Sequence, residues 1–302
     1  MKAIALIYWK PLLAVTLWGA SFIATKYALS ELNPLTVILL RLFLGIVLLS
    51  TLAVYARKDF SISLKNHRGI LLLALIAVFH LWIQVTGLQF TTASNTGWII
   101  GFTPVFMALL AVFVFKEKIT LIKIAGILIA FFGLLLLISK GDLSSIDLIS
   151  NKGDFLVLAS AFTWSIYSMV NKKVSVSYSP LMTILYLFIM MAVVLLPFTV
   201  NAKNFDLVLN LSGVGLVSIL FLGIFCSGVA YVLWAQALQE MESSKVGAFL
   251  YFEPFVTVFA AWLLLKEEIT LLIILSGVII TLGVLLVNIE SYLKFYLKNF
   301  RK

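Results

Sequence analysis

The sequence predicts an all-α integral membrane protein with ten transmembrane helices, arranged as two inverted-topology repeats of five helices each. Three observations predict this fold class: the composition, the spacing of long apolar runs, and an internal repeat. Of the 302 residues, 63% are hydrophobic and only 12% are charged. Soluble domains carry about 25% charged residues, so this chain has too few polar side chains to cover a water-soluble particle. Its apolar surface must therefore face lipid.

The apolar runs have the length that a bilayer requires, because a helix needs about 20 apolar residues to cross the hydrocarbon core. Lys2 and Lys10 precede the first run, as in a signal peptide. No small-residue cleavage site ends that run and nine more runs follow, so we interpret it as the first span. The predicted spans are residues 11–29, 34–55, 70–90, 95–115, 121–139, 155–171, 180–200, 213–236, 247–265 and 270–289.

The distribution of basic residues predicts the orientation. With the N-terminus in the cytoplasm, sixteen of the 22 Lys and Arg residues fall in cytoplasmic segments, five fall in external ones, and Arg41 lies within a span. Cytoplasmic loops carry such an excess of Lys and Arg. We therefore expect a multi-pass protein of the cell membrane (plasma or inner membrane), with both the N-terminus and the C-terminus in the cytoplasm.

The two halves of the sequence are similar to each other. With a shift of 146 positions Trp18 aligns with Trp164, and Pro34 aligns with Pro180. With a shift of 150, 17 of the 49 positions from 88 to 136 are identical, where chance would give about 5. The predicted organisation is a first repeat at 1–140, an external linker at 141–154, a second repeat at 155–290 and a basic cytoplasmic tail at 291–302.

The repeat indicates a transport function. Five spans are an odd number, so the second copy enters the membrane from the opposite side. Inverted repeats of this kind place a binding site near the bilayer midplane between the copies, and rocking one copy against the other exposes the site to alternate sides. Nothing in the chain matches a Walker A loop. We expect a carrier that is coupled to protons, to a counter-substrate or to neither.

These residues together resemble the EamA-type members of the drug/metabolite transporter superfamily, over nearly the whole chain. The resemblance implies ten helices, cytoplasmic termini, and export or exchange of amino acids or related metabolites. The sixth span departs from the pattern, because no glycine follows Trp164. The resemblance rests on the segments Trp18-Gly19-Ala20-Ser21-Phe22 with Lys26, Pro34 with Arg41, Gly87-Leu88-Gln89, Pro104, Glu117-Lys118-Ile119-Thr120, Ala237-Leu238-Gln239, Glu253-Pro254, Glu267-Glu268-Ile269-Thr270 and Gly283.

Two lone charges lie within predicted spans and occur in only one copy of the repeat. Glu253 aligns with Thr103, and Arg41 aligns with Leu187. An ionisable group within the membrane is costly and marks a candidate functional site. Glu253 is a candidate for proton coupling or substrate contact, or it hydrogen-bonds backbone that Pro254 frees. Arg41 binds a substrate carboxylate, or it extends outward to the membrane surface, or it satisfies carbonyl groups at the ends of spans.

Other candidates combine aromatic rings with amides. Trp18 and Trp164 are related by the repeat and lie too deep for an interfacial belt, so they suit the wall of a cavity or a packing role. A lone histidine such as His80 suits a helix contact as well as a ligand site. The complete set of predicted substrate-binding or cavity residues is Trp18, Arg41, His80, Gln84, Asn95, Trp98, Trp164, Tyr231, Trp234 and Tyr251.

Repeated turn residues are predicted to shape the helices. Pro104 and Pro254 lie mid-span, where proline frees a carbonyl and bends or breaks the helix. Broken helices often line transport sites, although a purely structural bend is the alternative. In the segments 117–120 and 267–270, we expect the glutamates to take part in turns and the closing threonines to cap the next helix.

Several function classes are disfavoured. The net charge of +9 does not indicate nucleic-acid binding, because the basic residues lie in short clusters between apolar runs. A single cysteine, Cys226, allows neither an internal disulfide nor a metal cluster, and we expect no cofactor. The chain has no HExxH motif, no paired intramembrane aspartates and no Ser-His arrangement, so we do not expect an enzyme. The expected partners are the lipid bilayer and a small-molecule substrate. A flippase for lipids or lipid-linked solutes is the main alternative.

Overall fold

The computed structural model describes residues 2–61, 63–115, 119–142, 151–173, 178–241, 246–247 and 249–299. Every regular element in these ranges is helical, which confirms the all-α class. The elements of the first half are α1 (Lys2–Leu29), α2 (Pro34–Tyr55), α3 (Leu64–Leu88), α4 (Ala93–Ile100), α5 (Thr103–Phe115) and α6 (Leu121–Ile138). Those of the second half are α7 (Lys152–Lys173), α8 (Pro180–Thr199), α9 (Ala202–Leu209), α10 (Gly213–Leu220), η2 (Phe221–Val229), α11 (Ala230–Glu240), η3 (Phe249–Phe252), α13 (Glu253–Ala260), η4 (Ala261–Leu265) and α14 (Leu271–Asn299).

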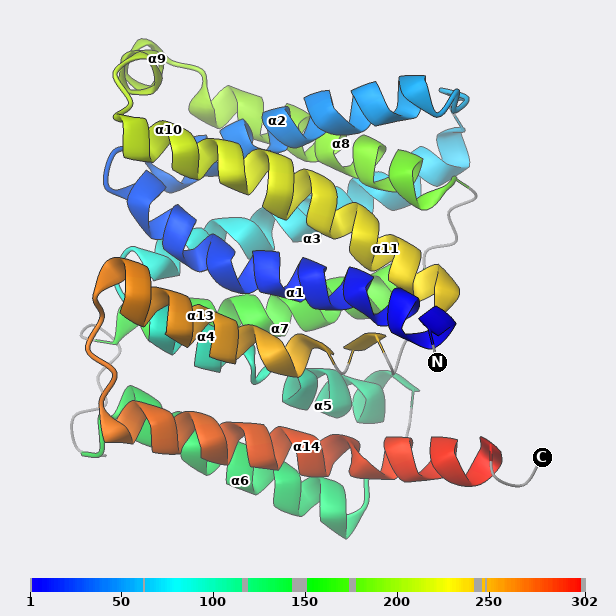
Figure 1. The fold of residues 1–302 in the computed structure, drawn as a ribbon, viewed down its shortest axis with the longest axis vertical. Coiled ribbons are helices and arrows are strands. Elements are labelled where there is room, and N and C mark those ends of the chain that lie inside the picture. The colour runs from blue at the N-terminus through cyan, green and yellow to red at the C-terminus, as the bar shows by residue number, and fades with distance from the viewer. Residues whose placement is uncertain are drawn as a thin grey trace.

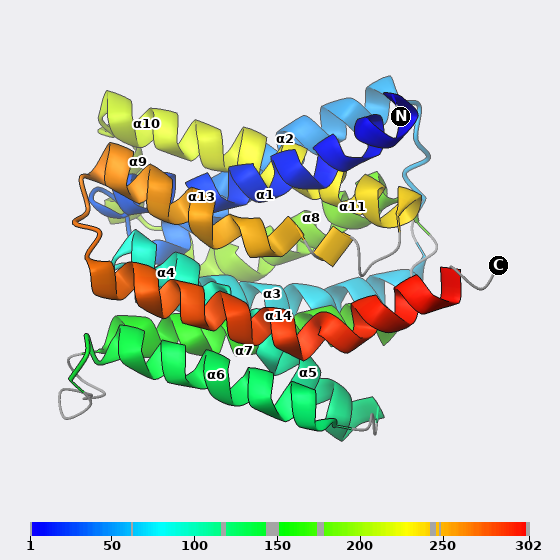
Figure 2. The ribbon, with the colours of Figure 1, turned by 60° about the horizontal axis from the view of Figure 1, so that its bottom comes forward.

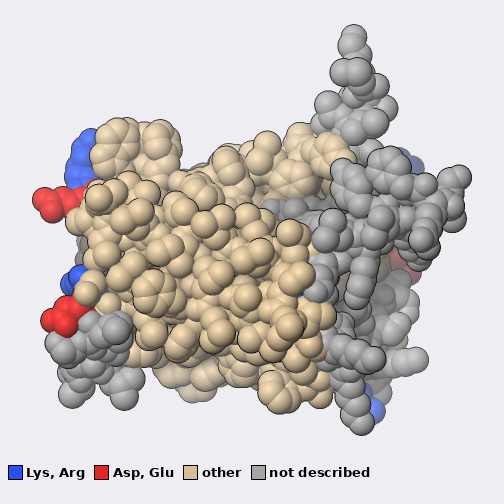
Figure 3. Space-filling model, turned by 90° about the horizontal axis from the view of Figure 1, so that it is seen from below, with Lys and Arg blue, Asp and Glu red and all other residues tan. Residues whose placement is uncertain are grey.

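The helices have the lengths and surfaces of a membrane protein. In the described part of the chain, nine helical segments are long and apolar enough to cross a membrane, and the shorter apolar segment Phe249–Leu265 adds a tenth. Figure 3 shows the face formed by α6 and α14, whose middle is uncharged while the coloured charges lie toward its ends. Large apolar side chains such as Leu128 and Leu282 are exposed on these two helices. This surface fits contact with lipid tails.

The helices run roughly side by side along one direction, and both termini lie at the same end of the bundle (Figures 1 and 2). An even number of crossings requires this arrangement. The ten segments therefore form one antiparallel bundle, as the sequence predicts.

The packing repeats itself in the way that a two-fold axis between the halves demands. Helix α1 packs against α11 of the second repeat. In the same way α7, the repeat mate of α1, packs against α3, which is the repeat mate of the segment from α10 to α11. Helix α2 packs against its own mate α8, and α6 packs against its own mate α14. The two repeats are thus interlocked, because each of these packing pairs joins one helix from each repeat.

Glycines allow the closest of these contacts, between α6 and α14. A Cβ added at Gly126 would lie 2.7 Å from the carbonyl oxygen of Gly283, and one added at Gly283 would lie 2.6 Å from the carbonyl oxygen of Gly126. Small residues at helix interfaces in membranes let two backbones approach in this way.

We therefore expect Gly283→Val to force α6 and α14 apart and to lower the thermal unfolding temperature of the detergent-purified protein by several degrees. Overpacking of a tight contact typically costs about 1–3 kcal/mol. The control is Leu282→Val on the neighbouring lipid-facing position, where the side chain is 54% exposed. Equal unfolding temperatures for the two variants would contradict the close contact as a source of stability.

The structure adds two elements that the sequence did not predict. The short helix α9 lies between the seventh and eighth spans and carries the polar residues Lys203 and Asp206. Helix α14 continues beyond the predicted end of the last span, so the predicted tail is helical as far as Asn299. Residues 143–150 of the predicted linker and 300–302 of the tail lie outside the described residues.

Candidate functional site

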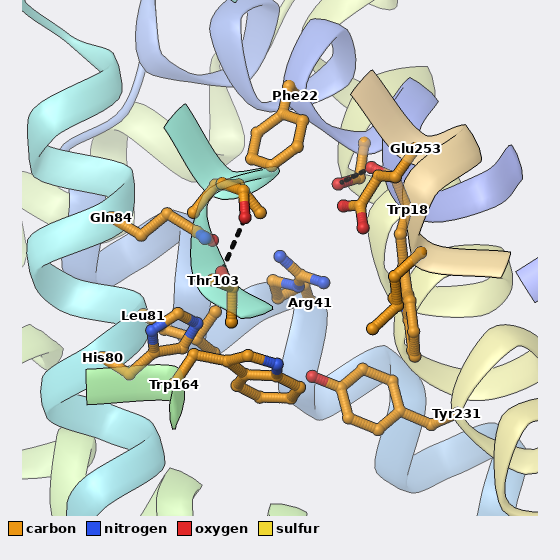
Figure 4. Close-up of a pocket in the computed structure, with 13 residues that line it drawn as sticks. Trp18, Phe22, Arg41, His80, Leu81, Gln84, Thr103, Trp164, Tyr231 and Glu253 are labelled. Carbon is orange, nitrogen blue, oxygen red and sulfur yellow. Dashed lines mark hydrogen bonds between the residues drawn. The ribbon is translucent and has the colours of Figure 1, made fainter. Parts of the chain in front are cut away.

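A cavity lies between the two repeats (Figure 4) and is partly open to its surroundings. The lining comes from α1 to α5 of the first repeat and from α7, α11, η3 and α13 of the second. The lining residues are Trp18, Ser21, Phe22, Arg41, His80, Leu81, Gln84, Ile100, Thr103, Trp164, Tyr231, Leu250 and Glu253.

The cavity lies on the pseudo-two-fold axis, because many of its lining residues are repeat mates of one another. The pairs that line it together are Trp18 with Trp164, Leu81 with Tyr231, Ile100 with Leu250, and Thr103 with Glu253. The charges break this symmetry. Arg41 lines the cavity, whereas its mate Leu187 is buried in an apolar cluster. The axis thus fixes the place of the cavity, and Arg41 and Glu253 give it polarity.

Arg41 is held at one side of the cavity and is only 7% exposed. Its Nε donates a hydrogen bond to Ser227 Oγ at 2.9 Å. Among the described residues, the two terminal NH2 groups have no hydrogen-bond partner, and Figure 4 shows the guanidinium within the cavity. The side chain therefore does not extend to the membrane surface, which was one alternative to a binding role.

Glu253 is the first residue of α13 and is 8% exposed. Its backbone carbonyl accepts a hydrogen bond from Thr257 Oγ1 at 3.0 Å. Within the described chain, its carboxylate has no hydrogen-bond donor and no cation within the 4.0 Å of an ion pair, Arg41 included. The sequence allowed a carboxylate that bonds backbone freed by Pro254, but the described residues show no such bond.

Aromatic rings form a large part of the remaining wall, beside polar residues such as Gln84 and Thr103 and aliphatic ones such as Ile100. Trp18 lies with its ring 5.3 Å from Tyr231, edge to face, and its Nε1 donates to the carbonyl oxygen of Cys226 at 3.1 Å. On the other side, Trp164 stacks on Tyr167 at 4.9 Å. Figure 4 shows Trp164 and Tyr231 facing each other across the cavity below Arg41. Their flat apolar surfaces suit the body of an organic solute.

The π-helix η2 anchors both sides of this arrangement. It supplies the Cys226 carbonyl that fixes Trp18 and the Ser227 hydroxyl that fixes Arg41. A π-helical turn inside a span is rare and frequently marks a functional site. The corresponding region of the first repeat lies within α3, which is a regular α-helix.

His80 makes a helix contact, the role that the sequence favours for a lone histidine, and it also lines the cavity. It is buried, and its Nδ1 lies 2.9 Å from the carbonyl oxygen of Ser160. Because a carbonyl oxygen only accepts, Nδ1 is the donor in this contact. The ring also lies 5.1 Å from Trp164 and lines the cavity. His80 therefore positions the aromatic wall through a satisfied helix contact.

Four predicted cavity residues lie outside the lining. The Asn95 amide donates to the Asp154 carboxylate at 3.4 Å. Trp98 is buried in the core against α14, the ring centres of Trp234 and Trp18 are 5.2 Å apart, and Tyr251 packs against an apolar cluster.

The sequence analysis did not predict the small and apolar residues of the lining. Two signals could have found them. Ser21 and Phe22 lie one helical turn from Trp18, and the repeat mate of a charged or aromatic candidate lies at the same depth in the membrane as that candidate, as Thr103 does for Glu253. The missed residues are Ser21, Phe22, Leu81, Ile100, Thr103 and Leu250.

The two prolines begin half-helices instead of kinking continuous ones. Pro104 is the second residue of α5, and Pro254 is the second residue of α13. At such positions the missing N–H is free in any case. The helix type changes just before each proline, from a turn at Gly101 to α5 and from the 3-10 helix η3 to α13, which places Thr103 and Glu253 at the first positions of these helices beside the cavity.

Carboxylates also tie the repeats together, at the end of the bundle away from the termini (Figure 1). Glu267 accepts hydrogen bonds from the backbone N–H groups of Ala93 at 2.8 Å and Ser94 at 3.0 Å, which caps α4 of the other repeat. The predicted caps at Thr120 and Thr270 are confirmed, because each accepts from the backbone three residues on. Glu117 lies outside the described residues.

Glu31 makes the corresponding tie to α10. The Ser212 hydroxyl donates to it at 2.6 Å and the Ser212 N–H at 2.7 Å. The pKa of the Glu31 carboxyl lies below its usual range, mainly because of the hydrogen bond from the Ser212 hydroxyl and then because of the one from the Ser212 N–H. A lowered pKa means that the contribution of this tie to stability is complete above the ordinary glutamate pKa and is lost as the pH falls through the lowered value.

We expect Glu267→Ala to lower the thermal unfolding temperature by a few degrees, because the N–H groups of Ala93 and Ser94 and the Ser94 hydroxyl lose their acceptor. Loss of a helix cap typically costs about 0.5–2 kcal/mol. The matched control is Glu268→Ala at the next position, where the side chain is exposed. A Glu268→Ala variant that loses as much stability as Glu267→Ala would refute the capping role.

Comparison with known proteins places these features in a family. The model of the EamA-like transporter family matches residues 2–139 and again residues 151–289. An uncharacterized transporter of Archaeoglobus fulgidus is 30% identical over 93% of this chain and 97% of its own length. The uncharacterized transporter YoaV of Bacillus subtilis is 29% identical over 90% of this chain and 94% of its own.

Two further proteins extend the comparison. A protein of Escherichia coli named "Probable amino-acid metabolite efflux pump" is 28% identical over 90% of this chain and 91% of its own. A crystal structure of a protein 15% identical in sequence superposes with a TM-score of 0.65, covering 93% of this chain and 98% of that one, which shows the shared fold. The two family matches together span most of the sequence, and the protein belongs to the EamA-like transporter family.

Proposed function

We propose that the protein is a secondary transporter that moves a small metabolite, an amino acid or a related compound, across the membrane by alternating access. The observation that carries this proposal is the cavity on the axis between two inverted repeats, lined by repeat-related pairs. Such an axis lets one repeat rock against the other around a fixed site. The name of the Escherichia coli relative supports an amino-acid-like substrate and export.

The proposal includes an orientation and an energy source. Both termini face the cytoplasm, because the segments on the same side of the membrane as the termini carry most of the Lys and Arg residues. Transport is driven by protons that Glu253 binds and releases, with counter-substrate exchange as the alternative source. Chemistry on the solute is not part of the proposal, because the lining holds no paired nucleophile and base in the described chain.

The direct test is solute flux in liposomes that contain only this protein. We expect labelled amino acids to exchange across these membranes faster than across protein-free ones. The variant Leu250→Trp should abolish that flux, because it fills the cavity from η3. The matched control Leu263→Trp changes a lipid-facing residue of η4, which is 45% exposed, and should keep the flux.

Two outcomes would overturn the proposal. One is the absence of flux for every amino acid and related metabolite tested, with the protein folded in the liposomes. The other is movement of a labelled lipid across the bilayer without solute flux, which would establish the flippase alternative.

A further inference from the structure

The cavity holds two opposite charges that do not pair with each other. Arg41 and Glu253 both line it, and each side chain is more than nine-tenths buried. They are not within ion-pair distance of each other. A buried charge without a partner is costly, so a site that keeps both charges apart is poorly satisfied when empty. A ligand that carries both complementary charges would satisfy both residues at once.

Arg41 is arranged to receive a carboxylate. Ser227 accepts from Nε and thereby fixes the plane of the guanidinium. The two terminal NH2 groups remain free of partners in the described chain, and they form the fork that binds carboxylates with two parallel hydrogen bonds. Among the described lining residues the only acid is Glu253, which does not reach them. An incoming carboxylate is therefore the complementary group.

Glu253 is arranged to receive a cation. An ionised carboxylate only accepts hydrogen bonds, and this one has no donor among the described residues. Arg41 is the only Lys or Arg among the lining residues that the structure describes. An ammonium group, with three donors, matches this acceptor.

The wall beside the two charges is aromatic. Trp18, Tyr231 and Trp164 present ring surfaces around Arg41 (Figure 4). Contacts between these rings and their neighbours, including the Trp18 bond to Cys226, hold them in place. The ring faces of such a wall bind apolar groups.

We propose that the substrate is a zwitterionic amino acid with an apolar side chain, whose carboxylate binds Arg41, whose ammonium binds Glu253 and whose side chain packs on the aromatic wall. This proposal rests on the proposed transport function and names its substrate class. Molecules that lack the carboxylate or the ammonium group should not be substrates. Amides and esters of the same amino acid lose the Arg41 contact, and the acid without its amino group loses the Glu253 contact.

The test compares three molecules that share one skeleton: leucine, leucinamide and 4-methylpentanoate. A second series uses phenylalanine, its amide and 3-phenylpropanoate. Binding is measured as the ligand-induced rise in the unfolding temperature of the purified protein, because a ligand that binds only the folded state stabilises it. We expect at least one of the two amino acids to bind, and each of its two analogues to bind about tenfold or more weakly.

Two variants assign each charge to its residue. Arg41→Gln should remove the preference for the amino acid over its amide, and Glu253→Gln should remove the preference over the acid without an amino group. The controls Arg68→Gln and Glu268→Gln change exposed charges away from the cavity and should keep the parent order of affinities. The parent preference is measured independently of the variants, so it tests the proposal even if a variant fails to fold.

The outcomes separate this inference from the transport function. Preferential binding of the amino acid without any flux in liposomes would sustain the substrate class and overturn transport. Flux of the series with no preference between the amino acid and its analogues would overturn the substrate class alone. A protein that neither binds nor moves any of the six molecules contradicts the substrate class, and the wider solute panel then decides on transport.

Discussion

Glu253→Gln is expected to abolish accumulation of solute driven by a pH gradient, while exchange of solute at equal pH continues at reduced rate. The ionised carboxylate is costly within the membrane and has no partner in the described chain, so a proton is readily taken up there. Glutamine keeps the size and the hydrogen-bonding capacity but does not titrate. Arg41 and the aromatic wall remain, which preserves weaker binding. The measurement is uptake into liposomes with and without an imposed pH gradient.

The control and a second variant sharpen this result. Glu268→Gln removes an exposed carboxylate close to the end of the same span and should leave the driven accumulation unchanged. Glu253→Ala should be worse than Glu253→Gln in both assays, because it also removes the hydrogen-bonding group from the site. A Glu253→Gln protein that accumulates solute as well as the parent, with the same pH profile, would show that proton coupling does not use this carboxylate.

Both roles proposed for Glu253 depend on the same negative charge. A carboxylate that is protonated no longer attracts an ammonium group, and one that binds an ammonium group has less affinity for a proton. The pH profile of binding should therefore differ between the amino acid and the acid that lacks its amino group. The amino acid needs the ionised carboxylate, whereas the other acid binds better when Glu253 is neutral.

The fold was predictable from the sequence because a bilayer imposes so few solutions. Each span must be a helix of a fixed minimum length, so the apolar runs define the elements almost directly. The alignment of Trp18 with Trp164 then indicates the two-fold axis, and the axis indicates where the cavity lies. Helix α9 escaped prediction because its eight residues are too few and too polar to give an apolar run.

The candidate site was only partly predictable, because depth in the membrane is readable from the sequence while rotation about the helix axis is not. Trp18 and Trp234 are both aromatic residues at moderate depth, yet one lines the cavity and the other lies behind it. Asn95 looked like a cavity amide but bonds Asp154, which lies 59 positions further along the chain. The cap that Glu267 makes on α4 likewise depends on the packing of distant segments, which no local pattern shows.

Trp18→Ala and Trp164→Ala are each expected to reduce transport about tenfold or more, while the protein still inserts in the membrane and purifies as a folded particle. Each ring forms part of the cavity wall, so its loss removes the surface on which the apolar part of the solute packs. The rings differ in their anchors: Trp18 donates to the Cys226 carbonyl, whereas Trp164 stacks on Tyr167. Flux in liposomes and gel filtration in detergent measure the two properties separately.

The control for both variants is Trp262→Ala, because Trp262 is 54% exposed to lipid on η4 and is not part of the cavity lining. We also expect Trp18→Phe to retain more transport than Trp18→Ala, because phenylalanine keeps an aromatic surface and loses only the hydrogen bond to Cys226. Truncation of a fully buried tryptophan costs about 3–5 kcal/mol of stability, and these two half-buried rings should cost less. If both alanine variants instead yield no folded protein while Trp262→Ala folds normally, the repeat-related pair holds the two repeats together, and the binding surface must be assigned to Tyr231 and Arg41.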